Sequence, residues 1–516
     1  MGPGEREFLL AEGSVGSAIA ERLAPRLTLE PAGTGNEARV LLDSFDGRLR
    51  ADGLQAHLAN GELVLLEAGV PPRRTRIQAA SRYLLSDIPG GPVRRRLAGV
   101  LEERALLPLA RVNVSQQALA VCNDDAKTVV RLTVEQLAVV ADRGRRIPLT
   151  PRLRLTPVRG YDAAFEQAER AIRQALAPDP ADRPLVDDAV AAAGGHPGGV
   201  SSKPRVALEE GLPAGRAAGL VLLRLADIAE ANLPGTLEDL DTEFLHDLRV
   251  SIRRARSVLR ELKDVFEPGG LARVRAELRW AQAVTGPVRD LDVQLLEWDE
   301  LAALVPADRA DGLAPLRGLL DDRRRRELGA LRRGLRSKRF SAGLAAWRAL
   351  AEASQQPGDA GQLAAVPVEA VTGARIRHVY RRMVRDGRAI GADSPDEALH
   401  DLRKRGKELR YLLEFFGGLY PAAVVKPMVA ALKDLQDVLG RFQDRTVQAE
   451  TLRDHGEELA TLPGGPGALI ALGSLIDALE ADQRAARAAF EDRFAAFASK
   501  RERAQVKATF PKAATP

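Results

Sequence analysis

A five-residue segment occurs twice in the second half of the chain, and a fixed spacing separates the two copies. Residues 245–249 and 399–403 both read LHDLR, 154 positions apart. The same offset relates further residues, namely Gly219 to Gly373, Asp290 to Asp444, Val293 to Val447 and Phe340 to Phe494. One register kept over so long a span indicates a tandem duplication. Each copy has room for about four helices, so we expect two lobes at residues 215–354 and 368–500.

The first part of the chain has a different pattern of apolar residues. Up to residue 156, apolar residues come in short alternating or β-branched runs between Gly, Pro and Asp turns, which is typical of strands. Residues 178–214 are rich in Pro, Gly and Ala and are expected to form a linker. The predicted fold class is therefore α+β with several domains. We expect a β domain at 1–177, an all-α domain at 215–500 and a basic tail at 501–516.

Composition excludes several classes of protein. A single cysteine, Cys122, rules out an intrachain disulfide framework and a four-cysteine zinc site. No apolar run approaches the ~18 residues of a membrane span, and the N-terminus lacks the layout of a secretory signal. We therefore expect a cytoplasmic protein without a membrane partner. Because the formal net charge is only +5, any anion site has to come from local clusters of basic residues.

The repeated segment begins a helix pattern that carries an apolar seam beside a cationic stripe. In the first copy, Leu245, Leu248 and Ile252 step by three and four, which predicts a helix face turned toward a core. One position later a second series has similar helical spacing and comprises His246, Arg249, Arg253, Arg256 and Arg260. The second copy repeats this stripe with His400, Arg403, Lys407 and Arg410.

A solvated helix face is the alternative interpretation of each stripe, and it stays open for a stripe taken alone. Solvated faces usually pair opposite charges at i,i+4, whereas these stripes place cation above cation, which is destabilising on an isolated helix. Arginine binds phosphate oxygens through two parallel N–H donors, and a cation one turn on lies about 5.4 Å further along a linear anion. The stripes therefore predict a polyanion site. His246 and His400 stand beside these cations and are expected to donate to phosphate oxygen, with a structural hydrogen bond as the alternative. Because no paired nucleophile or metal set accompanies them, we assign them binding and not catalysis.

Two stretches in each copy resemble a known family. The sequences HDLRVSIRRARSVL (246–259) and HDLRKRGKELRYLL (400–413), followed by PVRDLDV (287–293) and GRFQDRTV (440–447), resemble the two signatures of CHAD domains. The resemblance implies two four-helix bundles with pseudo-twofold symmetry, which enclose a basic channel that binds inorganic polyphosphate. It also implies a protein that gathers on polyphosphate granules, in the company of other granule proteins.

The resemblance assigns the basic residues of both stripes to the polyphosphate channel. Arg289 in the first copy's second signature and Arg377 on a later helix are expected to extend the site. Two departures weaken the second copy: Glu414 stands at the position equivalent to Arg260, and Gln443 stands where the first copy has Arg289. We therefore expect the second lobe to bind more weakly. We expect no catalytic residue, no metal ligand and no cofactor.

Residues 1–177 resemble the CYTH fold, a β-tunnel whose active members hydrolyse triphosphates with a divalent metal. The resemblance rests on Glu5 and Glu7, on LDSFDGRLR (42–50), on KTVVR (127–131) and on a closing helix pattern at 163–176. It departs at Leu9, where a lysine belongs, and at Arg152 and Arg154, where a late strand should supply acids. Arginines in place of acids invert the local charge, so Mg²⁺ should not be held. We expect a degenerate tunnel, kept as an interaction module, an accessory phosphate-binding module or a structural domain.

Two other functions remain as alternatives to polyphosphate binding. The first is binding of nucleic acid or another polyanion in the same groove. Aromatic residues make up only 4% of the chain, however, and none interleaves the first stripe. Stacking platforms for bases are therefore lacking, which argues against nucleic acid. The second is residual metal-dependent triphosphatase activity in the N-terminal domain.

Overall fold

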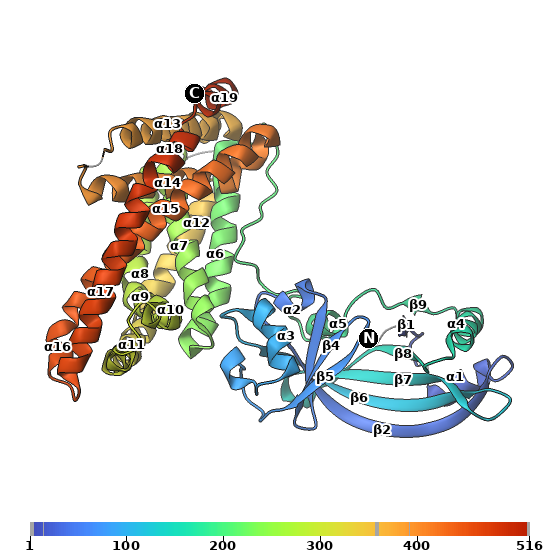
Figure 1. The fold of residues 1–516 in the computed structure, drawn as a ribbon. Coiled ribbons are helices and arrows are strands. Elements are labelled where there is room, and N and C mark those ends of the chain that lie inside the picture. Colours follow the sequence, from blue (N-terminus) through green and yellow to red (C-terminus); the bar gives the residue numbers. More distant parts are fainter. Residues whose placement is uncertain (1–4, 14, 357–360, 392, 513–516) are drawn as a thin grey trace. The chain divides into compact units, whose positions relative to one another are not determined.

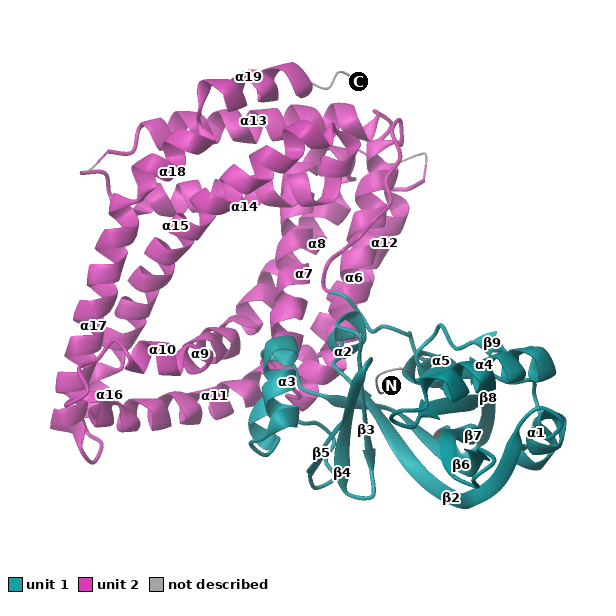
Figure 2. Cartoon of the chain, turned by 45° about the vertical axis from the view of Figure 1, so that its right-hand side comes forward, with its two compact units in different colours: residues 1–201 teal, residues 202–516 magenta. Residues whose placement is uncertain are grey.

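The computed structural model describes residues 5–13, 15–356, 361–391 and 393–512. The chain divides into two compact units, Met1–Ser201 and Ser202–Pro516 (Figures 1 and 2). The first unit is built on an antiparallel sheet and the second is helical, so the predicted α+β fold class is confirmed. Among the described helices, none is long and apolar enough to cross a membrane.

The strands of the first unit form one antiparallel sheet in the order β5-β4-β3-β2-β6-β7-β8-β1-β9. Their bounds are β1 (Arg6–Leu9), β2 (Thr28–Asp43), β3 (Leu54–Ala59), β4 (Glu62–Glu67), β5 (Val70–Arg76), β6 (Leu107–Cys122), β7 (Thr128–Val140), β8 (Arg146–Pro157) and β9 (Asp179–Pro180). The helices are α1 (Gly16–Leu23), α2 (Arg48–Ala51), α3 (Pro92–Leu101), α4 (Asp162–Leu176) and α5 (Leu185–Ala192), with short 3₁₀ turns η1 (Leu85–Asp87) and η2 (Asp142–Gly144).

Helices cover both faces of this sheet. Leu132 and Leu153 pack on the side of α1 and α4, in a core that includes Phe8 and Ile172. Because side chains alternate between faces along a strand, Leu137 lies on the opposite face, where it packs with α5. Part of the expected linker is therefore structured: α5 buries its apolar side against the sheet, which the Pro- and Gly-rich composition around it did not indicate.

The second unit consists of helices joined by short turns. Their bounds are α6 (Ala214–Glu238), α7 (Thr242–Glu261), α8 (Pro268–Val284), α9 (Gly286–Leu296), α10 (Trp298–Ala302), α11 (Ala314–Leu335), α12 (Lys338–Ala353), α13 (Val368–Arg388), α14 (Asp396–Phe416), α15 (Ala422–Asp454), α16 (Gly456–Ala460), α17 (Gly465–Ala488), α18 (Phe490–Phe497) and α19 (Lys500–Thr509). The 3₁₀ turns are η3 (Lys263–Val265), η4 (Ala310–Leu313) and η5 (Gly417–Leu419).

The duplication read from the sequence is preserved in the helix boundaries. Helices α6, α7 and α8 begin 154 residues before α13, α14 and α15. The two copies are joined by reciprocal hydrogen bonds: Ala214 N donates to Val366 O and Val368 N donates to Leu212 O, both at 2.8 Å. Residues 212 and 214 of the first copy correspond to residues 366 and 368 of the second, so each bond is the equivalent of the other. A pseudo-twofold axis therefore relates the copies.

One break distinguishes the copies. The first copy interrupts its third helix between α8 and α9, whereas α15 runs without a break through the equivalent residues. The interruption falls where the first copy has Gly286 followed by Pro287, and the second has Gly440 followed by Arg441. Proline lacks the N–H that continues a helix and crowds the preceding turn, which accounts for the break.

The two copies share their cores at both ends. Leu248 and Ile252 of α7 belong to one apolar cluster with Leu409 and Phe416 of α14. A second cluster at the far end joins α9–α11 to α15–α17, where Leu316 belongs to the same cluster as Leu472. The helices of this unit therefore form a closed ring of two lobes (Figure 2).

The expected basic tail is largely helical. Residues 500–509 form α19, and Val506 and Phe510 are buried in the main core. Phe510 stacks edge-on against Tyr420, with ring centroids 4.8 Å apart. The basic, alanine-rich composition of this segment did not indicate that Val506 and Phe510, four residues apart, would pack in the core. The other expected domain limits remain predictions.

Candidate anion-binding site

Helix α7 begins at a strong cap and presents the first cationic stripe. The Asp241 carboxylate accepts hydrogen bonds from the backbone N–H groups of Glu243 and Phe244, which satisfies donors that the first helical turn leaves free. Beyond this cap, the apolar seam is buried, and Leu248 and Ile252 are fully enclosed. The seam fixes the rotation of α7, so the stripe one position later lies at its edge, partly exposed.

Helices α7 and α14 meet near the middle of both stripes. Arg253 Nε donates to the Tyr411 hydroxyl at 2.7 Å. On either side of this contact, Arg254 pairs with Glu414, and Arg260 pairs with Glu408 at 3.1 Å. These three contacts all join the first copy to the second, so the two stripes approach each other at Arg253 and Lys407.

A pocket of about 220 Å³ lies beside this crossing. It is lined by Arg253, Arg256, Ser257, Arg260, Arg275, Arg279, Lys404, Lys407, Glu408 and Tyr411. The structure therefore brings four of the predicted residues together in one cavity: Arg253, Arg256 and Arg260 from α7 and Lys407 from α14. We call the lining residues without a carboxylate partner, Arg253, Arg256, Arg275, Arg279 and Lys407, the free cation cluster.

The free cation cluster is not neutralised by the protein. In the described part of the chain, no carboxylate oxygen lies within 4 Å of a charged nitrogen of these five residues. Burial lowers the pKa of Arg256, and the neighbouring Arg279, Arg260 and Arg275 lower it further. Burial likewise lowers the pKa of Lys407 to about 8, with Arg403 and Arg253 adding to the shift. Like charges held together in a partly buried site favour a bound anion.

The remaining residues of the first stripe lie nearer to acidic groups. Ligand atoms of His246, Glu243 and Asp247 lie within 4.8 Å of one another, so this imidazole faces carboxylates. Arg249 donates to Gln282 O at 3.0 Å and to the Thr285 hydroxyl at 2.9 Å.

The two arginines of this part of the site differ in their surroundings. Burial lowers the pKa of Arg249, and Arg253 and Arg289 lower it further, whereas Asp290 raises it. Arg289 lies 3.8 Å from Glu243. Arg249 therefore extends the field of the free cation cluster, while Arg289 is partly neutralised.

The second stripe is more fully paired within the protein. The Nδ1 atom of His400 lies 2.5 Å from Gln443 Oε1, and Arg403 donates to Asp444 at 2.8 Å. Arg410 is exposed to solvent and does not line the pocket. Gln443, which the sequence marked as a departure, thus holds the imidazole of the repeated histidine. The arrangement supports the expectation that the second lobe contributes less to anion binding, which remains a prediction.

Arg377 does not belong to this cluster. Its guanidinium donates to the backbone carbonyls of Phe510 at 3.0 Å and Lys507 at 3.3 Å, so it anchors the end of α19. The structure thus gives Arg377 a role in the fold, and its expected contribution to the site remains a prediction. The arginine-rich pattern of α13 did not indicate which residue meets the C-terminal helix. Arginines of α11 are also engaged in the fold: Arg324 bridges Asp239 and Asp292 at 2.6–2.9 Å.

Six lining residues escaped the sequence argument, among them Ser257 and Glu408. Arg275 and Arg279 stand on α8, Lys404 lies beside the second stripe, and Tyr411 supplies the hydroxyl at the crossing. The i,i+4 spacing of Arg275 and Arg279 was available as a signal. Whether these two arginines face α7 depends on how α8 packs. The repeat gave no indication of this, because the second copy has Val429 and Lys433 at the equivalent positions.

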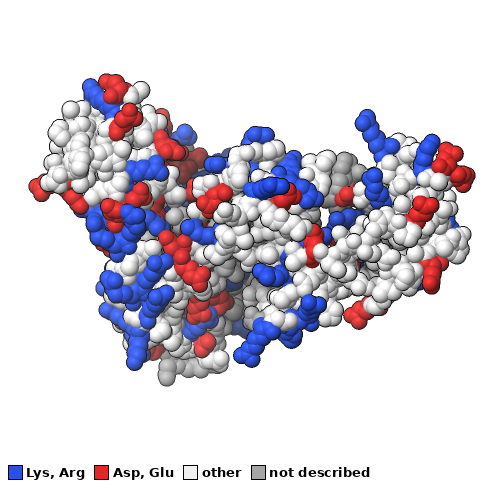
Figure 3. Space-filling view, turned by 90° about the horizontal axis from the view of Figure 1, so that it is seen from below, with Lys and Arg blue, Asp and Glu red and all other residues white. Residues whose placement is uncertain are grey.

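Charge is distributed over the surface of the molecule in patches. In the view of Figure 3, Lys and Arg side chains gather over the helical unit, with Asp and Glu side chains among them. The mixture explains why the formal net charge of +5 gives no indication of the free cation cluster.

The first unit holds a separate network of charged groups on the α5 face of its sheet. Arg152, with only 2% of its side chain exposed, pairs with Glu7 at 3.2 Å and with Asp188 of α5 at 2.7 Å. Glu135 pairs with Arg39 at 2.9 Å and with Arg154 at 3.6 Å. Burial alone would raise the pKa of Glu135, but these arginines hold it below its ordinary value.

This network does not fit a divalent metal. The two carboxylate oxygens of Glu7 each face an arginine, Arg152 and Arg154, and Glu135 is similarly occupied. A hard cation needs several carboxylate or carbonyl oxygens free to coordinate it. Glu7 and Glu135 are thus engaged by arginines, among them the two that the sequence showed in place of acids, Arg152 and Arg154.

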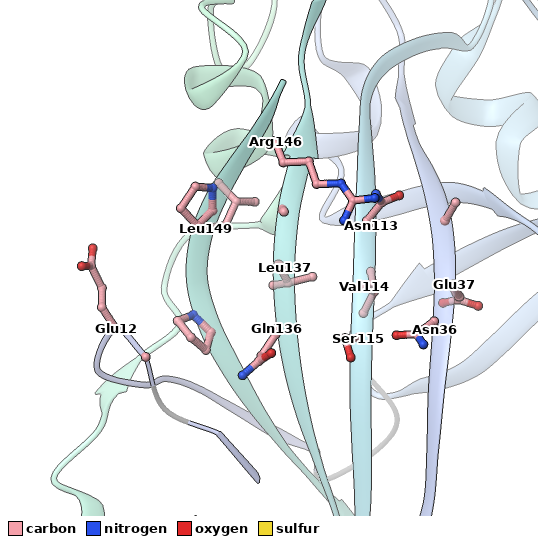
Figure 4. A pocket seen from close by; sticks show the side chains of 15 residues that line it. Glu12, Asn36, Glu37, Asn113, Val114, Ser115, Gln136, Leu137, Arg146 and Leu149 are labelled. Atoms are coloured by element: carbon pink, nitrogen blue, oxygen red, sulfur yellow. The ribbon is translucent and has the colours of Figure 1, made fainter. Parts of the chain in front are cut away.

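A larger groove of about 840 Å³ lies on the same sheet (Figure 4). The strand register places Asn36, Ser115 and Gln136 on one face, and all three line the groove. Arg146 extends toward Asn113 in the close-up. The lining mixes apolar and polar residues, and among its described residues Arg146 is the single cation, beside the acids Glu12 and Glu37. The groove therefore lacks the row of cations that a phosphate chain requires.

The second unit is thus a helical domain of two fused lobes that carries the free cation cluster. A family model described as the CHAD domain matches residues 219–453. The chain therefore contains a CHAD domain, the family that the repeated signatures indicated, and this family is associated with polyphosphate binding. The antiparallel sheet of the first unit is consistent with a CYTH-like tunnel.

Relatives and solved structures resemble parts of this chain. Two curated proteins of Mycobacterium tuberculosis, the uncharacterized proteins Rv2226 and MT2285, are each 32% identical over 223 residues. The match covers 42% of this chain and 43% of each relative, which is less than half of their length. The CHAD domain from the plant Ricinus communis is 23% identical, with a TM-score of 0.48, over 57% of this chain and 95% of that one. PptA from Streptomyces chartreusis is 19% identical, with a TM-score of 0.43, over 55% and 99%.

Proposed function

We propose that the helical unit binds inorganic polyphosphate without catalysis. The observation that carries the proposal is the free cation cluster, in which five basic side chains converge on one cavity without a carboxylate partner in the described part of the chain. Each guanidinium can bind phosphate oxygens through two N–H donors. A chain of phosphates supplies such oxygens at short, regular intervals, so one ligand can neutralise the whole cluster.

The stripes extend this cluster in two directions. Arg249 continues it along α7, and Arg403 continues it along α14 beyond Lys407. Arg403 has a carboxylate partner, but Asp444 is itself 60% exposed, so this pair can open toward solvent at small cost. We propose that the interior of a long polyphosphate chain follows this path.

The proposal is tested by capture on polyphosphate beads with RNA and DNA as competitors. We expect retention of the full chain at physiological salt, and displacement by free polyphosphate but not by excess nucleic acid. Tyr411 is the one aromatic residue in the lining that the structure describes, and its hydroxyl is engaged by Arg253. Stoichiometric displacement by RNA would favour the nucleic-acid alternative, and failure to bind the beads would reject the proposal.

Affinity is expected to fall by about tenfold between pH 7 and pH 9, because Lys407 must be protonated to bind an anion and its pKa is about 8. The charged groups that set this pKa besides burial are Arg403, Arg253, Asp444 and Arg410. Lys407→Arg retains the charge across this range and should flatten the pH profile. Titration calorimetry of both proteins checks this, and an unchanged slope in the variant would contradict it.

We also propose that the protein is cytoplasmic and gathers on polyphosphate granules. Binding through the helical unit would suffice to bring it there. A fluorescent fusion of the full chain should colocalise with polyphosphate granules, and a fusion in which Arg253 and Lys407 are replaced by glutamate should be dispersed. Granule association that survives these changes would point to a protein partner instead.

For the first unit we propose an accessory role without hydrolysis. Phosphate release from inorganic triphosphate is expected to stay at background with Mg²⁺ or Mn²⁺, because arginines occupy the oxygens of Glu7. Glu5→Gln should leave this background unchanged. Metal-dependent release that is lost in Glu5→Gln would revive the triphosphatase alternative.

A further inference from the structure

The pocket beside the α7–α14 crossing differs from the open path along the stripes. Arg253 and Lys407 belong to both, but the pocket adds Arg275 and Arg279 from α8, which the path does not use. Its volume of about 220 Å³ is small, below the range of ~300–1,000 Å³ that is usual for ligand pockets. It has room for a few phosphate groups and not for a long chain folded upon itself.

Acidic side chains limit the pocket at the end of α7. Glu408 lies in the lining and pairs with Arg260 at 3.1 Å. Behind it, Glu261 is only 6% exposed and accepts from Arg260 at 2.8 Å and from Arg375 at 2.6 Å. These carboxylates neutralise Arg260 and repel further negative charge. A polyanion that enters the pocket past the crossing therefore meets an unfavourable field at its far end.

Hydroxyl groups add donors to the lining. Tyr411 and Ser257 both line the pocket and are 7% and 4% exposed. The Ser257 hydroxyl is buried and has no hydrogen-bond partner among the described groups. A buried hydroxyl without a partner is costly, so a ligand oxygen brought within reach would be stabilised.

We propose that this pocket receives the terminal phosphate groups of a polyphosphate chain, whereas the stripes bind its interior. The inference rests on the proposed function and names the part of the ligand that the site recognises. An interior unit of the chain carries one negative charge, whereas a terminal unit carries almost two at neutral pH, since its second pKa is about 6 as in other phosphate monoesters. The pocket holds five basic side chains without a carboxylate partner among the described residues, and Glu408 in its lining repels further phosphate, so it suits the doubly charged terminal unit best.

The second copy differs from the first at three positions that correspond to the lining of this pocket. The positions equivalent to Arg260, Arg275 and Arg279 are Glu414, Val429 and Lys433. The chain should therefore hold one terminus and leave the other end of the polymer free.

The test compares polyphosphate of one defined length with and without blocked ends. Both termini are capped as phosphoramidates, which leaves each terminal unit with the single negative charge of an interior unit. Affinities for the full chain are measured by titration calorimetry at one salt concentration. We expect uncapped polymer to bind about tenfold more tightly, the difference that one strong charge-assisted hydrogen bond makes. Arg279→Glu should lower the affinity for uncapped polymer toward that for capped polymer.

Lys433→Glu is the matched control, because it makes the same charge change at the equivalent exposed position of the other lobe. It should keep the preference for free ends. Equal affinity of the unmodified protein for capped and uncapped polymer would overturn the inference, and so would equal loss of the preference in both variants. If neither polymer binds, the proposed function itself fails, so the two failures are distinguishable.

Discussion

Replacing Arg253 and Lys407 together by glutamate is expected to lower the affinity for long polyphosphate by about a thousandfold, since a hydrogen bond to a charged group contributes about 1.5–3 kcal/mol and two are lost. These side chains stand at the crossing of α7 and α14, where both stripes meet, and neither has a carboxylate partner among the described residues. Glutamates there would also repel the polymer. The affinity is measured by calorimetry or by retention on polyphosphate beads.

Two further variants separate charge from folding. Arg493→Glu with Arg501→Glu makes the same change in net charge at exposed positions of α18 and α19, and should bind almost as the unmodified protein does. Arg253→Lys with Lys407→Arg keeps both charges and should retain most of the affinity. Far-ultraviolet circular dichroism should be the same for all of them. Tight binding by a well-folded double glutamate variant would mean that the anion does not bind at the crossing.

Raising monovalent salt from 50 to 200 mM should weaken binding by about a hundredfold. Each neutralised phosphate contributes a slope of about −0.7 for a single-stranded polyanion, and the free cation cluster neutralises about five. The reason is counterion release: ions condensed on the polymer return to solution when arginines and lysines replace them. Affinity measured at four or five salt concentrations gives the slope directly.

Single neutralising changes should reduce this slope one step at a time. Arg256→Gln and Arg275→Gln should each make it shallower by about 0.7, whereas Arg325→Gln should not. Arg325 is exposed on α11 and already pairs with Asp322, so it releases no counterion when polymer binds. An affinity that is indifferent to salt would show that the ligand is held mainly by uncharged contacts.

The sequence alone gave the architecture of the helical unit because the repeat constrains it so strongly. The offset between His246 and His400 recurs in the starts of the paired helices and in the hydrogen bonds that join them. Apolar residues at helical spacing also fixed the rotation of α7, so Arg253 and Arg256 could be placed at the edge of its core. Both side chains line the pocket. Their position on the helix follows from the repeat of about 3.6 residues, which does not change when the helix packs.

Pairing within the protein could not be read in the same way. In the sequence, Arg403 and Arg377 look like Arg253, since each is a basic residue on a predicted helix. In the structure, Arg403 pairs with Asp444, and Arg377 anchors the end of α19. Which arginine finds a carboxylate or a carbonyl depends on residues far away in the chain. For the same reason the contribution of Arg275 and Arg279 was missed, and α5 was hidden in a segment whose composition resembles a linker.

The reciprocal hydrogen bonds between residues 212–214 and 366–368, together with the shared core of Leu248 and Leu409, have a consequence for the origin of this architecture. Half of the helical unit would expose that core to water, so a half-length ancestor could persist only as a homodimer. In a homodimer every substitution appears in both halves at once. Two copies in one chain are free of this constraint and can differ, as Arg260 and Glu414 do at equivalent positions, so that a nearly symmetric assembly has a direction.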